Sequence, residues 1–347
     1  MTLPTPFLAV DLPVLQTNIE RVATWAAGRG VALRPHVKTH KSLQLAALQL
    51  AAGATGITVA TVGEAEVFAA GGFDDILIAY PLWVDPVQRE RLAGLASRVR
   101  LTVGADSAEG LAGLVGLDVA VLIEVDSGHH RSGIAPERAG ELAALGAELG
   151  LYVAGVFTFP GHSYAAAEGP ARAAADEDAA LLRAAESFRA QGIEPRTLSG
   201  GSTPSLAFSG GEASEYRPGV YVFGDAQQWE LGTCTPEQIA LTVHARVVSH
   251  AGGRAVLDSG SKILGADRAP YASGFGRLLD HPDARIVMLS EHHAVVELAE
   301  LPALGSVVRV VPNHVCNAVN LVEELVVFDA SGEQRERWPV SARGRNN

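Results

Sequence analysis

The sequence predicts an α/β fold in two parts: a parallel (β/α)8 barrel of the TIM type, and a C-terminal all-β domain. Short apolar strand patterns alternate with helical patterns between residues 12 and 229, and eight such strands can be counted. After residue 229 the pattern changes to short β-branched runs separated by Gly, Pro and Asp. The length of 347 residues is enough for one barrel and a smaller domain. A doubly wound sheet is the competing architecture for the first part.

The barrel region contains helical and strand segments in alternation. Asp11 has the residue type of a helix N-cap, and Gly28 and Gly30 would end the first helix. The helices predicted from apolar residues at helical spacing span residues 13–27, 43–52, 63–70, 86–97, 107–116, 136–150 and 170–191. The strands predicted from short buried runs span residues 32–33, 56–60, 75–80, 99–103, 119–125, 152–157, 196–198 and 219–223.

The second part is predicted to consist of strands, each a short run bounded by turn residues. These strands span residues 239–248, 255–257, 284–289, 294–298, 306–311 and 325–328. Residues 7–10 are expected to join them. We therefore predict a barrel domain over residues 12–229 and a β domain formed by residues 1–11 together with 230–347. The last residues, 341–347, are expected to be frayed.

Composition and charge exclude several classes of protein. A hydrophobic content of 48% and a charged content of 19% are typical of a folded enzyme rather than a disordered chain. The net charge of −12 and the lack of a long basic run argue against a nucleic-acid partner and an anionic membrane. There is no apolar window of about 18 residues, and the N-terminus lacks the regions of a signal peptide. A cytoplasmic protein is expected, and the two cysteines are too few for a disulfide framework.

Lysine is rare in this sequence. Only three of the 27 lysine and arginine residues are lysines, and two of them, Lys38 and Lys41, lie in one short stretch after the first strand. A lysine amine can lose its proton when desolvated and attack a carbonyl, whereas arginine stays charged. Reactive groups of barrels lie at the carboxyl ends of the strands. One of these two lysines is therefore a candidate for Schiff-base chemistry, and a solvated loop cation is the alternative.

A glycine- and hydroxyl-rich loop, Ser-Gly-Gly-Ser-Thr-Pro-Ser at residues 199–205, follows the seventh strand. Glycines let backbone amides approach an oxyanion closely, and hydroxyls add donors. By itself such a run is more often a flexible turn. A phosphate site after the seventh and eighth strands nevertheless recurs in barrels. Combined with a Schiff-base lysine on the same face, the loop predicts pyridoxal phosphate as cofactor.

A possible metal site lies in the second part of the chain, where His314 and Cys316 are two residues apart. If this segment is a strand, both side chains point to the same side and could bind one soft divalent metal. Burial without a metal is the alternative. A site with only two protein ligands would leave positions open for water and substrate, which suits catalysis.

Together these motifs resemble the fold-type III pyridoxal-phosphate enzymes of the D-serine dehydratase and D-threonine aldolase group, relatives of alanine racemase. The resemblance extends over nearly the whole chain. It is carried by residues 5–6, 34–41, 124–133, 161–164, 200–204, 217–221 and 312–316. The first lysine stretch and the His-x-Cys motif are together the most specific part.

The resemblance implies an alanine racemase-like barrel carrying pyridoxal phosphate on Lys38, and a β domain carrying the metal on His314 and Cys316. It implies catalytic roles for Lys38 and His162. The cofactor-binding residues that it implies are Lys38, Arg131, Tyr164, Gly200, Gly201, Ser202, Thr203, Gly219 and Tyr221. It also implies a head-to-tail homodimer with the active site at the interface, and a small D-amino acid as substrate.

The His-x-Cys form is similar to the dehydratases, which use zinc, whereas the aldolases have His-x-Asp with a harder cation; Mn2+ or Mg2+ is the alternative here. The implied reaction is a D-serine dehydratase-like β-elimination on a D-3-hydroxy amino acid. Lys38 would remove the Cα proton and the metal would help the hydroxyl to leave, giving a 2-oxo acid and ammonia. Retro-aldol cleavage to glycine and an aldehyde is one alternative. An amino-acid racemase, with Tyr271 as a candidate second base, is another.

The chain departs from the family pattern at two places. Residues 159–160 are Phe-Pro where a histidine is expected before Gly161 and His162. Residues 291–293 are Glu-His-His where Glu-His-Gly is common. Both departures concern positions that could face the substrate, so they bear on which D-amino acid is accepted.

Overall fold

The computed structural model of the protein describes residues 3–165 and 168–347. The chain divides into two compact units. One, the barrel unit, comprises residues 22–38, 46–219 and 344–347. The other, the β unit, comprises residues 1–21, 39–45 and 220–343.

The sheet of the barrel unit is an eight-stranded, all-parallel barrel. Its strands are β2 (Ala32–Leu33), β3 (Ile57–Val59), β4 (Asp75–Pro81), β5 (Arg100–Ala105), β6 (Ala120–Glu124), β7 (Tyr152–Phe157), β8 (Thr197–Gly200) and β9 (Glu215–Tyr216). They are hydrogen-bonded in the order β2-β9-β8-β7-β6-β5-β4-β3. The ring closes where the Thr58 amide donates to Pro35 O at 2.8 Å and His36 forms a parallel bridge with Thr58. The predicted (β/α)8 architecture is confirmed.

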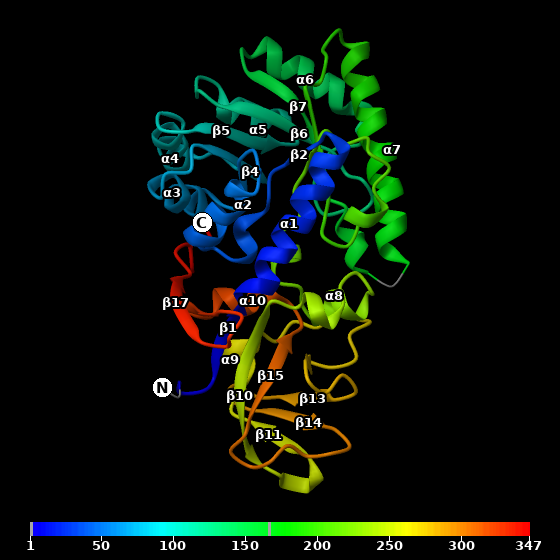
Figure 1. Ribbon diagram of the computed structural model, residues 1–347. Coiled ribbons are helices and arrows are strands. Elements are labelled where there is room, and N and C mark those ends of the chain that lie inside the picture. The colour runs from blue at the N-terminus through cyan, green and yellow to red at the C-terminus, as the bar shows by residue number, and fades with distance from the viewer. Residues whose placement is uncertain (1–2, 166–167) are drawn as a thin grey trace. The chain divides into compact units, whose positions relative to one another are not determined.

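Helices alternate with these strands, and Figure 1 shows α3 to α7 on the outside of the barrel strands. The helices are α1 (Leu12–Arg29), α2 (Leu43–Ala51), α3 (Val62–Ala70), α4 (Pro86–Ala96), α5 (Ala108–Leu114), α6 (Ala139–Glu148) and α7 (Gly169–Ala190). Thr61, Asp85 and Ser107 cap α3, α4 and α5 by accepting a backbone N–H three residues on. These side chains fix where the chain turns from a strand into a helix.

The eighth strand is not the one that the sequence predicts. Residues 220–222 form a 3-10 turn rather than a strand, and the eighth strand is β9, at residues 215–216. Pro218 has no backbone N–H for a sheet ladder, which separates the apolar run after it from β9. The apolar run at 219–223 has strand-like composition but leads instead into the short helix α8 (Ala226–Glu230).

The β unit is built on a mostly antiparallel nine-stranded sheet. Its strands are β1 (Phe7–Asp11), β10 (Leu241–Ser249), β11 (Ala255–Leu257), β12 (Gly276–Leu278), β13 (Arg285–Leu289), β14 (Ala294–Glu297), β15 (Val307–Pro312), β16 (Glu324–Phe328) and β17 (Gln334–Pro339). Two short helices, α9 (Ser261–Leu264) and α10 (Val315–Asn320), interrupt the strands. The strand β1 pairs with β10 and β16, so the N-terminal segment joins this sheet as expected. Strand β17 was not predicted because it is a polar edge strand.

The C-terminal tail was expected to be frayed, but it is held by hydrogen bonds. In the β unit the Ala342 amide donates to Lys41 O at 3.1 Å. In the barrel unit the Thr61 hydroxyl donates to Arg345 O at 2.6 Å, and the Gly63 amide donates to Asn347 O at 2.6 Å. The Asn347 carbonyl thus satisfies an otherwise free N–H in the first turn of α3, a contact that sequence composition alone does not reveal.

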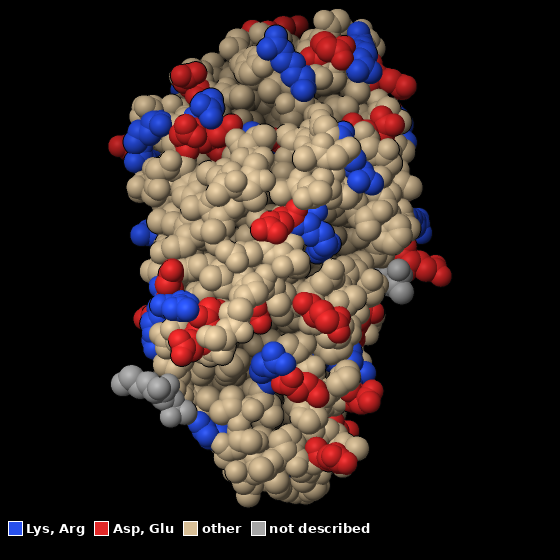
Figure 2. Space-filling model, in the orientation of Figure 1, with Lys and Arg blue, Asp and Glu red and all other residues tan. Residues whose placement is uncertain are grey.

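The surface face drawn in Figure 2 shows acidic and basic side chains interspersed rather than gathered by sign. Within the part of the chain that the structure describes, no helix is long and apolar enough to span a membrane.

Gly140 is expected to be essential for the packing of α6 against α7. A Cβ at this position would lie 2.0 Å from Ser187 O and 2.4 Å from its carbonyl carbon. We predict that Gly140→Ala lowers the free energy of unfolding by about 1–3 kcal/mol, because backbone cannot give way as a flexible side chain can. Thermal or urea unfolding measures this.

Gly94 provides the matched control, because it lies in α4 with no atom within 4 Å of a built Cβ. Gly94→Ala should stabilise by up to about 1 kcal/mol through helix propensity. Equal effects of the two substitutions would contradict the close approach of the two helices.

Candidate active site

The carboxyl ends of three barrel strands meet around one aromatic ring, that of Phe159. Lys38 follows β2, and its Nζ lies 5.6 Å from the centre of the Phe159 ring. Arg131 follows β6, and its Cζ lies 5.2 Å from the same centre. The His129 ring meets Phe159 edge-on at 5.8 Å, and the Tyr164 ring lies 6.3 Å away. The structure therefore brings the predicted Lys38, Arg131 and Tyr164 together.

Phe159 occupies the position where the family pattern suggested histidine, and its electron-rich face attracts the two cations. Among the described residues, no carboxylate forms an ion pair with Arg131. Its guanidinium can therefore serve an anionic or phenolic oxygen of a bound molecule. The neighbouring His129 has a lowered pKa because of burial and then because of the charges of Arg131 and His162.

His162 stands in the short 3-10 turn after β7 (Gly161–Tyr164). Its Nε2 lies 3.1 Å from Asp176 Oδ2 on α7, and its ring lies over Gly128, where a Cβ would be 3.3 Å from Cε1. Within residues 3–165 and 168–347, its buried Nδ1 has no hydrogen-bond partner. Asp176 thus holds the ring at Nε2, and Nδ1 can form a hydrogen bond with a ligand.

The predicted phosphate loop contains a buried chain of hydroxyls. Ser163 Oγ lies 2.8 Å from Ser202 Oγ, which in turn lies 2.8 Å from Ser205 Oγ. Gly201 has a backbone φ of +87°, a conformation that residues with a side chain rarely adopt. Thr203, the residue that follows Ser202 in the sequence, is half-buried. Several hydroxyl donors at the ends of β7 and β8 fit a phosphate group, as the sequence suggested.

A buried carboxyl group that the sequence analysis did not single out supports this loop from behind. Glu177 Oε1 on α7 accepts the Gly201 N–H at 2.6 Å, and a Cβ on Gly200 would lie 2.4 Å from the same oxygen. Burial raises the pKa of Glu177 to about 8, against the opposing effects of the Gly201 N–H and Arg217. The available signal was a charged residue on the buried face of a helix whose other buried residues are apolar.

The remaining two predicted cofactor residues fall in different units. Gly219 is the last residue of the barrel-unit segment that contains β9, and Tyr221 is a buried residue of the β unit. Between β9 and Gly219 lies Arg217, a buried guanidinium that donates to Ser199 Oγ at 2.8 Å. It ties the ends of β8 and β9 together.

In the β unit, His314 and Cys316 do come together, but not through strand alternation. Strand β15 ends at Pro312; His314 is the N-cap of α10, and Cys316 lies in the first turn of that helix. Their side chains are hydrogen-bonded to each other. The Nδ1 atom of His314 also lies 2.8 Å from Asp267 Oδ2. The strand expectation was wrong because Asn313 and His314 leave the sheet to start a helix.

The surroundings of His314 are strongly acidic. Burial by itself lowers the pKa of His314, but Cys316 and Asp267 outweigh it and raise that pKa to about 11. Asp225 is buried, and it accepts the amides of Gln228 at 2.9 Å and Val315 at 3.2 Å. Burial raises the pKa of Asp225 to about 6, partly opposed by His314. Such a field attracts a cation, and thiolate and imidazole are the ligand types that zinc prefers.

Cys316 is also linked to the residue that follows the candidate Schiff-base lysine. Its Sγ lies 3.3 Å from the hydroxyl oxygen of Thr39, which belongs to the β unit. Lys41 in the same segment is buried, and its amine donates to Asn320 Oδ1 at 2.8 Å on α10. Lys41 therefore has a structural partner that accounts for its burial.

Two further polar segments lie on exposed turns. His130 is exposed and its Nδ1 lies 2.6 Å from Asp126 Oδ2. Residues 291–293 form an exposed turn between β13 and β14, where Glu291 pairs with Lys262 at 2.7 Å.

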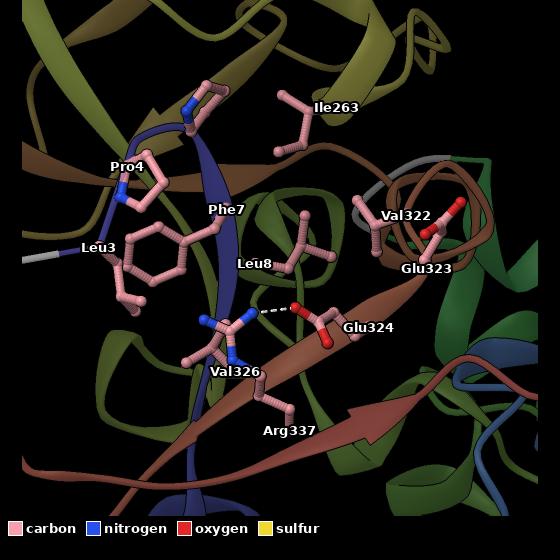
Figure 3. A pocket seen from close by; sticks show the side chains of 11 residues that line it. Leu3, Pro4, Phe7, Leu8, Ile263, Val322, Glu323, Glu324, Val326 and Arg337 are labelled. Carbon is pink, nitrogen blue, oxygen red and sulfur yellow. Dashed lines mark hydrogen bonds and ion pairs between the residues drawn. The ribbon is translucent and has the colours of Figure 1, made fainter.

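A pocket in the β unit, shown in Figure 3, is lined mainly by apolar side chains such as Leu3, Phe7 and Val326. Its one charged pair joins Arg337 to Glu324 across the rim. No residue of the candidate site lines it, and its chemistry suits neither a phosphate nor a metal.

Comparison with known proteins agrees with this geometry. The family described as "Alanine racemase, N-terminal domain" matches residues 10–227, and the "Putative serine dehydratase domain" matches residues 240–328. The chain belongs to the alanine racemase N-terminal domain family.

Several members of this family are similar along their whole length. The D-threo-3-hydroxyaspartate dehydratase of Delftia sp. (strain HT23) is 35% identical, covering 91% of this chain and 92% of the relative. The solved D-threonine aldolase of Filomicrobium marinum is 34% identical, with a TM-score of 0.90, covering 99% and 96% of the two chains.

Variants of a D-threo-3-hydroxyaspartate dehydratase have also been solved. A cysteine-to-alanine variant in the metal-free form is 32% identical, with a TM-score of 0.89, covering 97% of each chain. A histidine-to-alanine variant is substituted two positions earlier, which is the spacing of His314 and Cys316.

The raised pKa of Glu177 predicts a distinctive dependence of stability on pH. The folded state holds the Glu177 proton more tightly than the unfolded state, so this contribution to stability is complete below about pH 4.5 and is lost as the pH rises through about 8. Glu177→Gln should remove this slope. Urea unfolding at about pH 5, 7 and 9 measures it.

Glu148→Gln, an exposed substitution at the end of α6, serves as the matched control and should keep the wild-type slope. If Glu177→Gln keeps that slope as well, Glu177 is ionised in the folded protein at neutral pH.

Proposed function

We propose that this protein is a pyridoxal-phosphate- and metal-dependent lyase for D-3-hydroxy amino acids, acting by D-serine dehydratase-like β-elimination to a 2-oxo acid and ammonia. The observation that carries the proposal is the His314–Cys316 pair, whose thiol contacts Thr39 at 3.3 Å. Thr39 is bonded directly to Lys38 in the chain. Relatives named as a dehydratase and as aldolases support a lyase of this substrate class.

The residues of the barrel unit fit pyridoxal phosphate. Lys38 would hold its aldehyde, the hydroxyls of Ser202 and Thr203 would bind its phosphate, and Arg131 is placed for its ring substituents. When bound, this cofactor supplies an electron sink for the electrons of the substrate Cα–H bond. The Lys38 amine, once released, is the base that takes the Cα proton. The Lys38 amine lies over the ring of Phe159, 5.6 Å from its centre.

The residues of the β unit fit a soft divalent cation. His314 and Cys316 would hold it, and the thiolate favours zinc over Mn2+ or Mg2+. When bound, such a cation is a Lewis acid for the substrate hydroxyl. A solved D-threo-3-hydroxyaspartate dehydratase variant with a cysteine replaced by alanine is in the metal-free form, which supports the assignment of Cys316 as a ligand.

Retro-aldol cleavage is the second candidate function, because relatives over nearly the full chain are named as D-threonine aldolase and 3-hydroxy-D-aspartate aldolase. The same residues would serve if the substrate hydroxyl lost its proton instead of leaving. The thiolate at Cys316 favours elimination, since it matches the dehydratase form of the motif.

A racemase is disfavoured by Tyr271, the candidate second base. Burial, followed by the charges of Asp225 and Glu230, raises the pKa of Tyr271 well above its ordinary value. A phenol that holds its proton so tightly is poorly matched to proton exchange near neutral pH. The homodimer remains a prediction, for which size-exclusion chromatography with light scattering is the measurement.

Lys38→Ala should abolish the visible absorbance of the protein reconstituted with pyridoxal phosphate, because no other amine takes its place. Lys41→Ala is the matched control and should keep that absorbance, since the Lys41 amine is held by Asn320. Visible absorbance that survives in Lys38→Ala but disappears in Lys41→Ala would show that the cofactor is bound to Lys41 instead.

The proposed reaction is tested by products and by metal removal. Incubation with D-serine should give a 2-oxo acid and ammonia, whereas glycine from D-threonine would indicate the aldolase and racemised D-alanine a racemase. A chelator should reduce elimination by orders of magnitude, and zinc should restore it, because hydroxide is a poor leaving group without a Lewis acid. Full elimination activity in metal-free protein would refute the role of His314 and Cys316.

A further inference from the structure

A carboxylate outside every motif of the sequence faces the proposed metal ligand. Asp267 lies in the loop between α9 and β12, and its Oδ2 is 2.8 Å from Nδ1 of His314. The two residues are 47 positions apart in the chain, so the tertiary fold alone brings them together. Both belong to the β unit.

This contact decides which ring nitrogen of His314 can bind a cation. A carboxylate accepts hydrogen bonds, so Nδ1 must carry the proton that is shared with Asp267. The lone pair of the neutral ring is then on Nε2. Metal-binding histidines commonly donate their second N–H to a carboxylate, which fixes the tautomer and the orientation of the ring and raises its basicity.

The loop that carries Asp267 is itself fastened to the segment that carries His314. The side chain of Asn313 donates to Asp267 O at 3.2 Å and to Gly274 O at 2.9 Å. Gly265 has a φ of +77°, and a Cβ at this position would lie 3.0 Å from Asp267 Oδ1. The lack of a side chain at Gly265 therefore leaves room for the Asp267 carboxylate. The Asn313 side chain therefore holds the loop that carries Asp267 beside the segment that carries His314.

We propose that Asp267 is a positioning residue for the metal: it holds His314 as the Nδ1–H tautomer, directs Nε2 to the cation, and strengthens that bond by its negative charge. This inference rests on the proposed metal-dependent function. Asp267 acts through His314 rather than as a third ligand. Within the described parts of the chain, no three His, Cys, Asp or Glu side chains converge as a metal-binding group.

The test measures zinc affinity directly, without substrate, by competition with a chromogenic chelator on the purified full-length protein. Wild type is compared with Asp267→Asn, Asp267→Ala and His314→Ala. The asparagine keeps an oxygen that can accept from Nδ1 but has no charge, whereas alanine keeps neither. We expect zinc binding to weaken in the order wild type, Asn, Ala, with a loss of about 10- to 100-fold in the last.

A matched control and a spectroscopic readout separate positioning from general damage to the fold. Asp280→Asn removes a carboxylate of the same unit that pairs with Arg309, and it should bind zinc like wild type. With Co2+ in place of zinc, the thiolate charge-transfer band reports that Cys316 is still bound. This band should persist in Asp267→Ala, while the ligand-field bands shift because the histidine is reoriented.

The outcomes distinguish this inference from the proposed function. Zinc affinity that is unchanged in both Asp267 variants, but lost in His314→Ala, overturns the role of Asp267 and leaves the metal site intact. Wild-type protein that binds no more zinc than His314→Ala overturns both. Asp267→Ala that loses zinc while Asp267→Asn matches wild type shows that the hydrogen bond suffices, and it overturns the part assigned to the charge.

Discussion

The hydrogen bonding that closes the barrel is the constraint on which the candidate site of the barrel unit depends. The Thr58 amide donates to Pro35 O, and the pairing of His36 with Thr58 continues this contact beyond the two-residue strand β2. Without this contact the segment after β2 would be a free sheet edge. With it, Lys38 is held at the carboxyl end of the barrel, where it shares the Phe159 ring with Arg131. Main-chain hydrogen bonding therefore helps to place the candidate lysine.

Buried charged groups also link the strands of the barrel. Arg34 bridges Glu215 at 2.7 Å and Asp75 at 2.5 Å, so strands β4 and β9 are linked through one guanidinium. Arg217 lies wholly inside, and its pKa is lowered by burial although nearby carboxylates oppose this. Replacing such groups by apolar residues is often neutral for stability, so their presence suggests a requirement for orientation. Glu177 fits this view, because its carboxyl group shapes the glycine turn beneath the hydroxyl cluster.

In the proposed function the β unit meets a different requirement, which is to hold two ligands of one soft cation in a fixed relation. Placing His314 at the N-cap and Cys316 in the first turn of α10 brings the two side chains together over a single turn of backbone. Asp225 anchors that turn by accepting the Val315 amide, and Asp267 orients the imidazole. The acidic surroundings that stabilise a cation are thus also the groups that hold the helix start in place. The thiol contact to Thr39 then connects this helix to the segment that directly follows Lys38.

The sequence by itself determined the barrel, most of the strands of the β unit, and the residue types of the candidate site. These follow from local patterns: strand and helix periodicity, caps such as Thr61 and Asp85, and the rarity of lysine. Only the tertiary structure decided that residues 220–222 turn away from the sheet and that His314 starts a helix, because composition does not distinguish a buried strand from a buried turn. Only the tertiary structure also revealed the roles of Asp267 and Glu177. The role of a carboxylate depends on the group that it faces, and the partners of these two residues are distant in the chain.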